Sequence, residues 1–171
     1  EFDLIEDGAP FTLENWQVSS DAKAVAAPVY HFAIRQSGVN LDFHLANFFR
    51  HEQVSFHFFE DFESLVKISR RFPVTAIVIG TRSDLVREIE LIHPVKNNVF
   101  LSIVPVILYH PAPELGMVGA AYQNGAEEFI YGEWMEKLVE VRVRRVIERS
   151  QRDLAVNPST RLPGPAMIED E

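Results

Sequence analysis

Six histidines and several runs of neighbouring carboxylates are the side chains of this sequence that could most readily bind a metal ion or transfer a proton. A zinc site needs three or four such ligands at short distances. His51 and His57 flank an expected helix-to-strand junction, and their spacing does not match a known ligand geometry. His31 falls inside an expected strand and His93 near the end of an expected helix. We therefore expect structural or surface histidines and no metal site.

His110 differs from the other histidines because it comes at the end of an expected strand. The carboxyl ends of strands are where open α/β sheets place their chemistry. His110 is therefore either a pH-responsive group or a hydrogen-bonded side chain that fills space. We favour the second interpretation.

The carboxylate runs at 60–61, 127–128 and 169–171 lack the arrangement of a general acid and base. Adjacent residues of a helix do not share a face, and the first two runs fall at boundaries between expected elements. We interpret them as helix N-terminal acids and solvated charges. The glycines of "ELGMVGAA" (114–121) follow the fourth expected strand rather than the first, so they do not form a dinucleotide-binding fingerprint.

The composition narrows the class of protein further. The 171 residues include no cysteine, which excludes disulfides, thiolate zinc sites and cysteine nucleophiles. A net charge of −9 disfavours nucleic-acid binding, which needs a cationic face. No apolar run approaches the roughly 18 residues of a membrane helix. We expect a cytoplasmic protein with neither nucleic-acid nor membrane partners.

Strands and helices alternate five times from residue 29 onward. The expected strands cover 29–34, 54–59, 74–79, 104–110 and 125–131, and the third is a continuous apolar run that ends at Gly80 without a carboxylate. Helical spacing of apolar residues separates them, and a long helix covers 133–153. Thr81 and Asp84 fit a capping box for the third helix. The pattern predicts an α/β protein with a flavodoxin-like, doubly wound, five-stranded parallel sheet in three α/β/α layers.

The stretches "PVILYH" (105–110) and "AAYQNGAEEFIYGEW" (120–134) resemble the last two strands of response-regulator receiver domains. The resemblance covers approximately residues 29–150. It implies a CheY-like fold and a regulatory role, in which an aspartate at the end of the third strand is phosphorylated. An acidic pair after the first strand would hold Mg²⁺, with a Thr or Ser ending the fourth strand and a Lys ending the fifth.

When the family's functional positions are carried over to this sequence one by one, none of them holds the expected chemical group. The acidic pair falls at Arg35 and Gln36, and the acceptor at Ile79 or Gly80. The hydroxyl position is His110 and the lysine position is Gly132. The resemblance therefore implies a receiver-like domain without phosphorylation chemistry, with no catalytic residue, cofactor or metal.

The phrase "NPSTRLPG" (157–164) resembles the opening of GGDEF domains, the diguanylate cyclase family. Seven of its eight residues fit the family pattern, and Ser159 departs from it. Pro165, directly after the phrase, departs as well. The resemblance implies an output domain of a bacterial cyclic di-GMP signalling protein that begins at residue 157. The residues up to Glu171 include no nucleotide-binding or metal-binding position of that family, so we expect no enzyme activity in them.

The long helix has two apolar sides and a basic side. Trp134, Leu138 and Val141 lie along one side, and we expect Val146 and Ile147 to lie beyond the sheet, without a partner in the domain. The helix either packs only on its own sheet or joins a second copy in a parallel dimer. Receiver-type domains also associate through the adjoining fourth-helix and fifth-strand face.

These observations divide the chain into an N-terminal extension (1–27), a receiver-like domain (28–143), a linker helix (144–156) and the start of a GGDEF domain (157–171). We interpret it as a non-phosphorylatable regulatory domain and homodimer. It would couple a protein or small-molecule signal to the output domain in cis. The alternative is a flavodoxin-like domain that binds a small anionic ligand with Arg35 and His110. An independent enzyme has the least support, because no nucleophile, base and orienting group converge.

Overall fold

The structure is a computed structural model that describes residues 29–133 and 136–156. Its strands are β1 (Val29–Ser37), β2 (Gln53–Phe58), β3 (Ala76–Thr81), β4 (Val106–His110) and β5 (Glu128–Tyr131). Its helices are α2 (Leu41–Phe48), α3 (Phe62–Arg71), α4 (Val86–Asn97), α5 (Leu115–Gln123) and α6 (Glu136–Val156). The expected extension at 1–27, Trp134 and the GGDEF-like segment at 157–171 lie outside the described residues.

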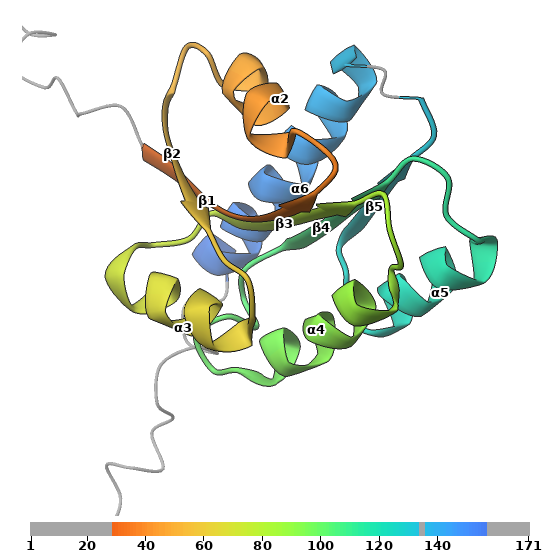
Figure 1. The fold of residues 1–171 in the computed structure, drawn as a ribbon. Helices are drawn as coiled ribbons and strands as arrows, with labels where there is room; N and C mark the ends of the chain where they lie inside the picture. The colour runs from red at the N-terminus through yellow and green to blue at the C-terminus, as the bar shows by residue number, and fades with distance from the viewer. Residues whose placement is uncertain (1–28, 134–135, 157–171) are drawn as a thin grey trace, which may run out of the picture.

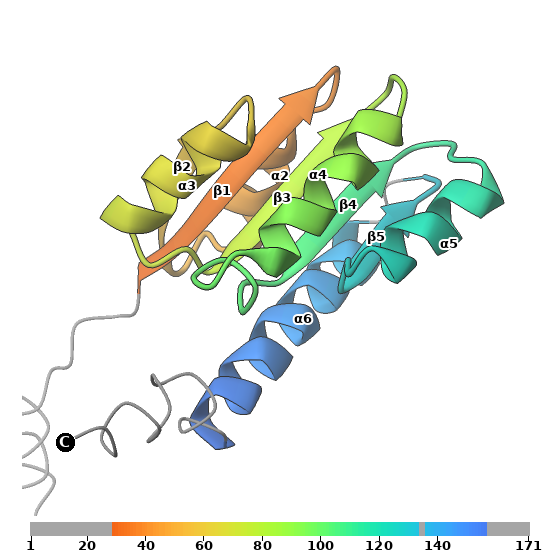
Figure 2. The same cartoon turned by 90° about the horizontal axis from the view of Figure 1, so that it is seen from below.

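The five strands form one parallel sheet in the order β2-β1-β3-β4-β5. Helices α2 and α6 cover one face, and α3, α4 and α5 cover the other (Figure 1). The second view shows α6 running obliquely along the side of the sheet away from α3, α4 and α5, with its last turns extending past the sheet (Figure 2). This is the predicted CheY-like, doubly wound arrangement in three α/β/α layers, so the fold class is confirmed.

The central strand β3 is buried along its whole length. Ala76 and Val78 belong to the apolar cluster under α2 and α6, while Ile77 and Ile79 belong to the cluster under α3, α4 and α5. Side chains of a strand alternate between the two faces, and here both faces are covered. This explains why the sequence of β3 is a continuous apolar run rather than an alternating one.

The capping box predicted at Thr81 and Asp84 is wrong. The Thr81 hydroxyl lies 2.8 Å from the Ser83 hydroxyl and accepts from the Ser83 N–H at 3.0 Å. Asp84 alone accepts from the Val86 N–H, at 2.9 Å, at the start of α4. A complete capping box occurs instead at the start of α3, between Asp61 and Ser64.

Helix α6 packs on its own sheet for longer than the sequence suggested. Val139, Val143 and Ile147 are each at most 3% exposed in the cluster under α2 and α6, and Val146 packs against it. Val146 and Ile147 therefore have a partner within the domain, which corrects the expectation that they lie beyond the sheet. The spacing of 139, 143 and 147 places these three residues on one helical face, which continues the packing by another turn.

Candidate functional site

A hollow of about 500 Å³ lies where the carboxyl ends of β1 and β3 meet the start of α4. It corresponds to the phosphorylation pocket implied by the receiver resemblance. Its lining combines two arginines with three carboxylates and small polar residues: Arg35, Gln36, Ser37, Glu60, Gly80, Ser83, Asp84, Arg87 and Glu88. We call it the carboxyl-end pocket.

Arg35 is neutralised within this pocket. Its Nε donates to Glu88 Oε2 at 2.7 Å, and the Glu88 side chain is only 8% exposed. A carboxylate taken out of water needs a paired charge, and removing either partner leaves the other charge uncompensated. Arg35 is therefore a structural counter-charge for Glu88 of α4, at the position where the receiver resemblance would place an acid.

Gln36 serves as a helix cap. Its side-chain oxygen accepts from the N–H groups of Leu41 and Asp42 at 2.8 and 3.3 Å, and its amide nitrogen donates to Asp42 Oδ1 at 3.1 Å. The first N–H groups of a helix have no partner within the helix. The N-cap residue Asn40 makes no side-chain hydrogen bond to them, so Gln36 supplies one from the neighbouring strand.

The acceptor position has no free space. A Cβ atom at Gly80 would lie 2.7 Å from Leu41 Cδ1 and 2.9 Å from Val39 Cγ2. The preceding residue, Ile79, is 1% exposed in the core. Neither position could accommodate an aspartate without displacing the packing of α2 or of the core.

His110 makes hydrogen bonds with both ring nitrogens. Its Nε2 lies 3.1 Å from the Ser83 carbonyl oxygen, and its Nδ1 accepts from the Ala112 N–H at 3.1 Å. The hydrogen bonding agrees with the interpretation favoured from the sequence, although His110 is only partly buried. His110 lines a separate hollow of about 220 Å³ with Met117 and the β4–α5 connection, whereas Arg35 lines the carboxyl-end pocket.

Gly132 occupies the position of the expected lysine in a conformation that suits glycine. Its φ is +85°, and its N–H donates to the Pro111 carbonyl at 3.0 Å. A residue with a side chain is uncommon at such a φ and would be strained there. The backbone turn after β5 therefore disfavours a lysine directly.

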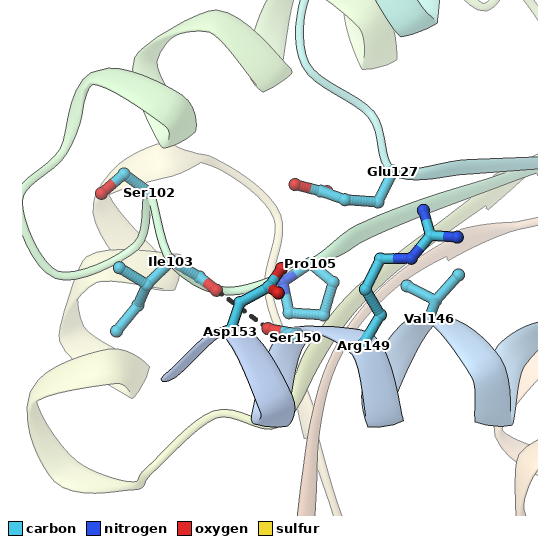
Figure 3. A pocket seen from close by; sticks show the side chains of 8 residues that line it. All are labelled: Ser102, Ile103, Pro105, Glu127, Val146, Arg149, Ser150 and Asp153. Atoms are coloured by element: carbon cyan, nitrogen blue, oxygen red, sulfur yellow. Dashed lines mark hydrogen bonds between the residues drawn. The ribbon is translucent and has the colours of Figure 1, made fainter. Parts of the chain in front are cut away.

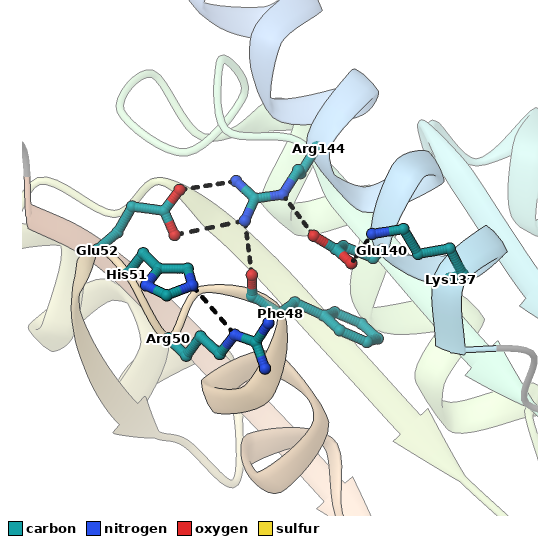
Figure 4. Close-up of polar contacts among 7 residues, drawn as sticks. All are labelled: Phe48, Arg50, His51, Glu52, Lys137, Glu140 and Arg144. Atoms are coloured by element: carbon teal, nitrogen blue, oxygen red, sulfur yellow. Dashed lines mark hydrogen bonds and ion pairs between the residues drawn. The ribbon is translucent and has the colours of Figure 1, made fainter.

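Arg144 of α6 forms the most connected polar cluster among the described residues, which sequence reasoning did not identify (Figure 4). Its guanidinium contacts Glu52 at 2.9 and 3.4 Å, the Phe48 carbonyl at 2.6 Å and Glu140 at 3.1 Å. It also lies 4.4 Å from the Phe49 ring centroid. The hydrogen bond to Glu52 is the main cause that raises the pKa of Arg144 above its ordinary value. We call this cluster the Arg144 junction.

The lower part of α6 has a lighter attachment to the domain. The Ser150 hydroxyl donates to the Ile103 carbonyl at 3.2 Å, across a hollow of about 170 Å³ lined also by Arg149 and Asp153 (Figure 3). A neutral hydrogen bond of this kind contributes about 1 kcal/mol. The Arg144 junction therefore holds α6 more firmly than this contact does.

The acidic run at 127–128 has partners that the sequence did not reveal. Glu127 pairs with Lys96 and accepts from the Val106 N–H, and Glu128 pairs with Arg142 at 2.6 Å. The interpretation of these two residues as solvated charges is therefore wrong, whereas Glu60 is exposed as expected and the run at 169–171 lies outside the described residues. Asp61, by contrast, is the helix N-terminal acid that was expected, and its hydrogen bonds from Ser64 lower its pKa.

Two histidines that the sequence analysis treated separately lie together. His31 Nδ1 is 3.0 Å from His57 Nε2, and the His57 ring stacks on Phe72 with 4.0 Å between centroids. Burial, followed by the neighbouring His31, lowers the pKa of His57. In the adjacent parallel strands β1 and β2, every second residue points to the same face of the sheet, and His31 and His57 share one face. This alternation could have indicated the pair from the sequence. No group of three or more potential metal ligands occurs within 29–133 or 136–156.

Comparison with known proteins places the fold among receiver domains. The structure resembles the receiver domain of a signal-transduction histidine kinase from Syntrophus aciditrophicus, with 16% identity, a TM-score of 0.56, and coverage of 70% of this chain and 90% of that chain. A histidine-kinase receiver domain from Pseudomonas aeruginosa, crystallised with magnesium in its active-site cleft, is 12% identical with a TM-score of 0.55, and the match covers 71% of this chain and 99% of that chain. The CheY-like protein TadZ from the same organism is 18% identical with a TM-score of 0.56, and the match covers 68% of this chain and 98% of that chain. The chain has the CheY-like fold of receiver domains.

The sequence itself carries little of this similarity. No family model matches it, and no curated protein matches it. Among the described helices, none is both long and apolar enough to cross a membrane.

Proposed function

We propose that this chain is a receiver-like regulatory domain that works without phosphorylation. The Arg35–Glu88 ion pair carries the proposal, because it puts a neutralised arginine in place of the acids that would hold Mg²⁺. The packing of Leu41 and Val39 against Gly80 supports it, since it leaves no room for an acceptor side chain. A domain of this kind responds by population shift, when a protein or small molecule binds one conformation better than another.

In this proposal, α6 carries the response to an output domain. The helix is fixed at Arg144 and continues to Val156, next to the segment whose sequence resembles the start of a GGDEF domain. That segment lies outside the described residues, so the GGDEF assignment stays a prediction. Any cyclase activity would belong to that output domain rather than to these residues.

The proposed function includes association with a second copy, and exposed apolar residues support one face for it. Part of the exposed apolar surface lies on α5, β5 and the first turns of α6: Leu115, Tyr122, Tyr131, Leu138 and Val141. Further along α6, exposed charged residues such as Arg145, Glu148 and Arg152 separate this group from the exposed apolar residues Leu154 and Val156. This favours the α5–β5 face with the start of α6 over a continuous coiled coil.

The small-anion alternative has less support. Arg35 already has a carboxylate partner, and Glu60 and Asp84 add negative charge to the same pocket. His110 lines a different hollow. An anion would therefore meet a carboxylate-rich lining with one unpaired arginine, Arg87.

The deciding experiment is a titration with beryllofluoride and Mg²⁺, followed by amide chemical shifts. We expect no saturable shift at Arg35, Gly80 or His110, because Gly80 offers no carboxylate that could take beryllofluoride and the carboxylate of Glu88 is already paired with Arg35. A saturable response centred on these residues would contradict the proposal.

Sedimentation at several concentrations tests the association face. The double substitution Leu138→Lys with Val141→Lys should lower the association constant at least about tenfold. Val99→Lys with Phe100→Lys is the matched control, since these residues are 82% and 71% exposed in the connection between α4 and β4. Equal effects of the two double variants would reject this face. Shortening α6 would be a poor test, because it removes core side chains.

A further inference from the structure

The two edge strands of the sheet, β2 and β5, present their outer backbone groups differently. An edge strand has a row of N–H and C=O groups without a neighbouring strand, which another chain can pair with. Natural sheets normally obstruct such pairing with charged side chains, proline, bulges or a covering element. The β5 edge follows this rule and the β2 edge does not.

At the β5 edge, side chains of the same domain close the backbone groups. The Phe129 N–H donates to the Tyr122 hydroxyl at 3.1 Å and to Glu128 Oε1 at 2.9 Å, and the Phe129 carbonyl accepts from Arg142 at 2.9 Å. Arg142 and Glu128 also form an ion pair at the same place. This edge is short, charged and already hydrogen-bonded.

At the β2 edge, alternate backbone groups point away from the sheet. The Phe59 N–H donates to the Ile34 carbonyl at 3.0 Å, which marks the residues of this strand that face β1. In a parallel ladder the facing residues alternate, so the N–H and C=O groups of Val54, Phe56 and Phe58 point outward. Within the described part of the chain, no side chain or loop hydrogen-bonds to these groups.

The side chains of β2 do not obstruct pairing either. The strand reads QVSFHF and contains neither proline nor a charged residue. Val54 and Phe56 pack against the cluster under α2 and α6, while Phe58, on the same face, is 55% exposed. An uncharged edge that ends in an exposed aromatic ring fits a strand that another strand covers.

We propose that β2 pairs antiparallel with β2 of a second copy, so that the two sheets become one continuous sheet. A two-fold axis opposite Phe56 sets Val54 against Phe58 of the second copy and joins the outward groups by about six hydrogen bonds. Each Phe58 ring then covers a Val54, and the two Phe56 rings meet across the axis.

Charge at the ends of this strand opposes the pairing only weakly. In this register Glu52 falls opposite Glu60 of the second copy. Glu52 is already paired with Arg144 at 2.9 Å, so its charge is largely offset within its own domain. Added salt should therefore strengthen the contact or leave it unchanged. The contact is separate from the α5–β5 face, and its failure would leave the proposed regulatory function untouched.

Amide hydrogen exchange of the full chain at high and low protein concentration tests the pairing directly. The amides of Val54, Phe56 and Phe58 should exchange at least about tenfold more slowly in the concentrated sample. Those of Ser55 and His57, which bond to β1, should not change. Outward amides that exchange at the same rate at both concentrations would overturn the proposal.

Substitution of the exposed ring gives an independent test. Phe58→Lys should lower the association constant of this step at least about tenfold, whereas Phe43→Lys, at a 68% exposed ring on α2, should not. Retained protection of the β3 amides would establish that both variants are folded. A chain lacking residues 1–27 distinguishes pairing with a second copy from pairing with the N-terminal segment of the same chain. If the outward amides are protected even at low concentration and lose that protection in this deletion, the N-terminal segment covers β2 and the proposal is wrong.

Discussion

Two arginines organise the two main polar regions of this molecule, and they differ in what they hold together. Arg35 makes one short contact, to the buried carboxylate of Glu88, and so joins β1 to α4 inside the carboxyl-end pocket. Arg144 contacts the end of α2, the chain before β2 and its own helix, and also lies over the ring of Phe49. The first region has charges that offset each other locally, while the second fixes the position of the helix that leaves the domain.

This difference teaches where the fold can transmit a signal. We expect a pocket with an internal ion pair and no space at Gly80 to have little affinity for a phosphoryl group. A helix held by several charge-assisted hydrogen bonds moves as a unit with the elements that hold it. We therefore expect changes near Glu52 and Phe48 to reach α6 more readily than changes in the carboxyl-end pocket.

The largest expected effect comes from restoring an acid at the strand end. Gly80→Asp should lower the free energy of unfolding by about 3 kcal/mol, because the new side chain clashes with Leu41 and Val39 and buries a polar group. Urea unfolding measures this loss. Gly116→Asp is the matched control, since a Cβ there meets open space, and it should cost little. A stable Gly80→Asp protein that binds beryllofluoride would show that the pocket is still poised for phosphorylation.

A smaller effect is expected at the other arginine. Arg144→Met keeps much of the side-chain length but removes the hydrogen bonds to Glu52 and Phe48, and should cost about 2 kcal/mol. The adjacent Arg145 is exposed and has no hydrogen bond or ion pair with any residue that the structure describes, so Arg145→Met should be neutral. Hydrogen exchange along α6 should rise only in the first variant. Equal stability of the two variants would remove the contrast drawn between Arg35 and Arg144.

The smallest effect concerns pH. The hydrogen bond from Arg144 is the main cause that lowers the pKa of Glu140 below its ordinary 4.5. The unfolded chain therefore binds more protons than the folded one between these two pKa values. The contribution of Glu140 to stability is complete above about pH 4.5 and is lost as the pH falls through the folded-state pKa.

We expect this contribution to stay below about 1 kcal/mol, because Glu140 lies near the surface. Urea unfolding between pH 6 and pH 3 should show a shallower acid loss for Glu140→Gln than for the wild type. In the Arg144→Met background the same substitution should have a smaller effect on the slope, because only Lys137 is then left to lower the pKa of Glu140. An unchanged slope in the wild-type background would contradict the assignment.

Secondary structure and fold class could be predicted from the sequence because they depend on local periodicity. The apolar run before Gly80 predicted a strand buried on both faces, and β3 is buried from end to end. The absence of acids at Arg35 and Gln36 is likewise visible in the sequence alone. What these residues do instead could not be predicted: Glu88, the partner of Arg35, lies 53 positions away.

The sequence by itself therefore determined the order of strands and helices along the chain and their expected burial, since a period of 2 or 3.6 residues follows from backbone geometry. The lack of phosphorylation groups is a prediction that rests on the receiver resemblance. Tertiary structure alone decided the pairing of Arg144 with Glu52, the burial of Ile147 and the difference between the two sheet edges. Each of these depends on how helices dock on the sheet, which brings together side chains that are far apart along the chain. Docking also explains why glycine suits position 80, because the side chain of Leu41 fills the space that an aspartate would need.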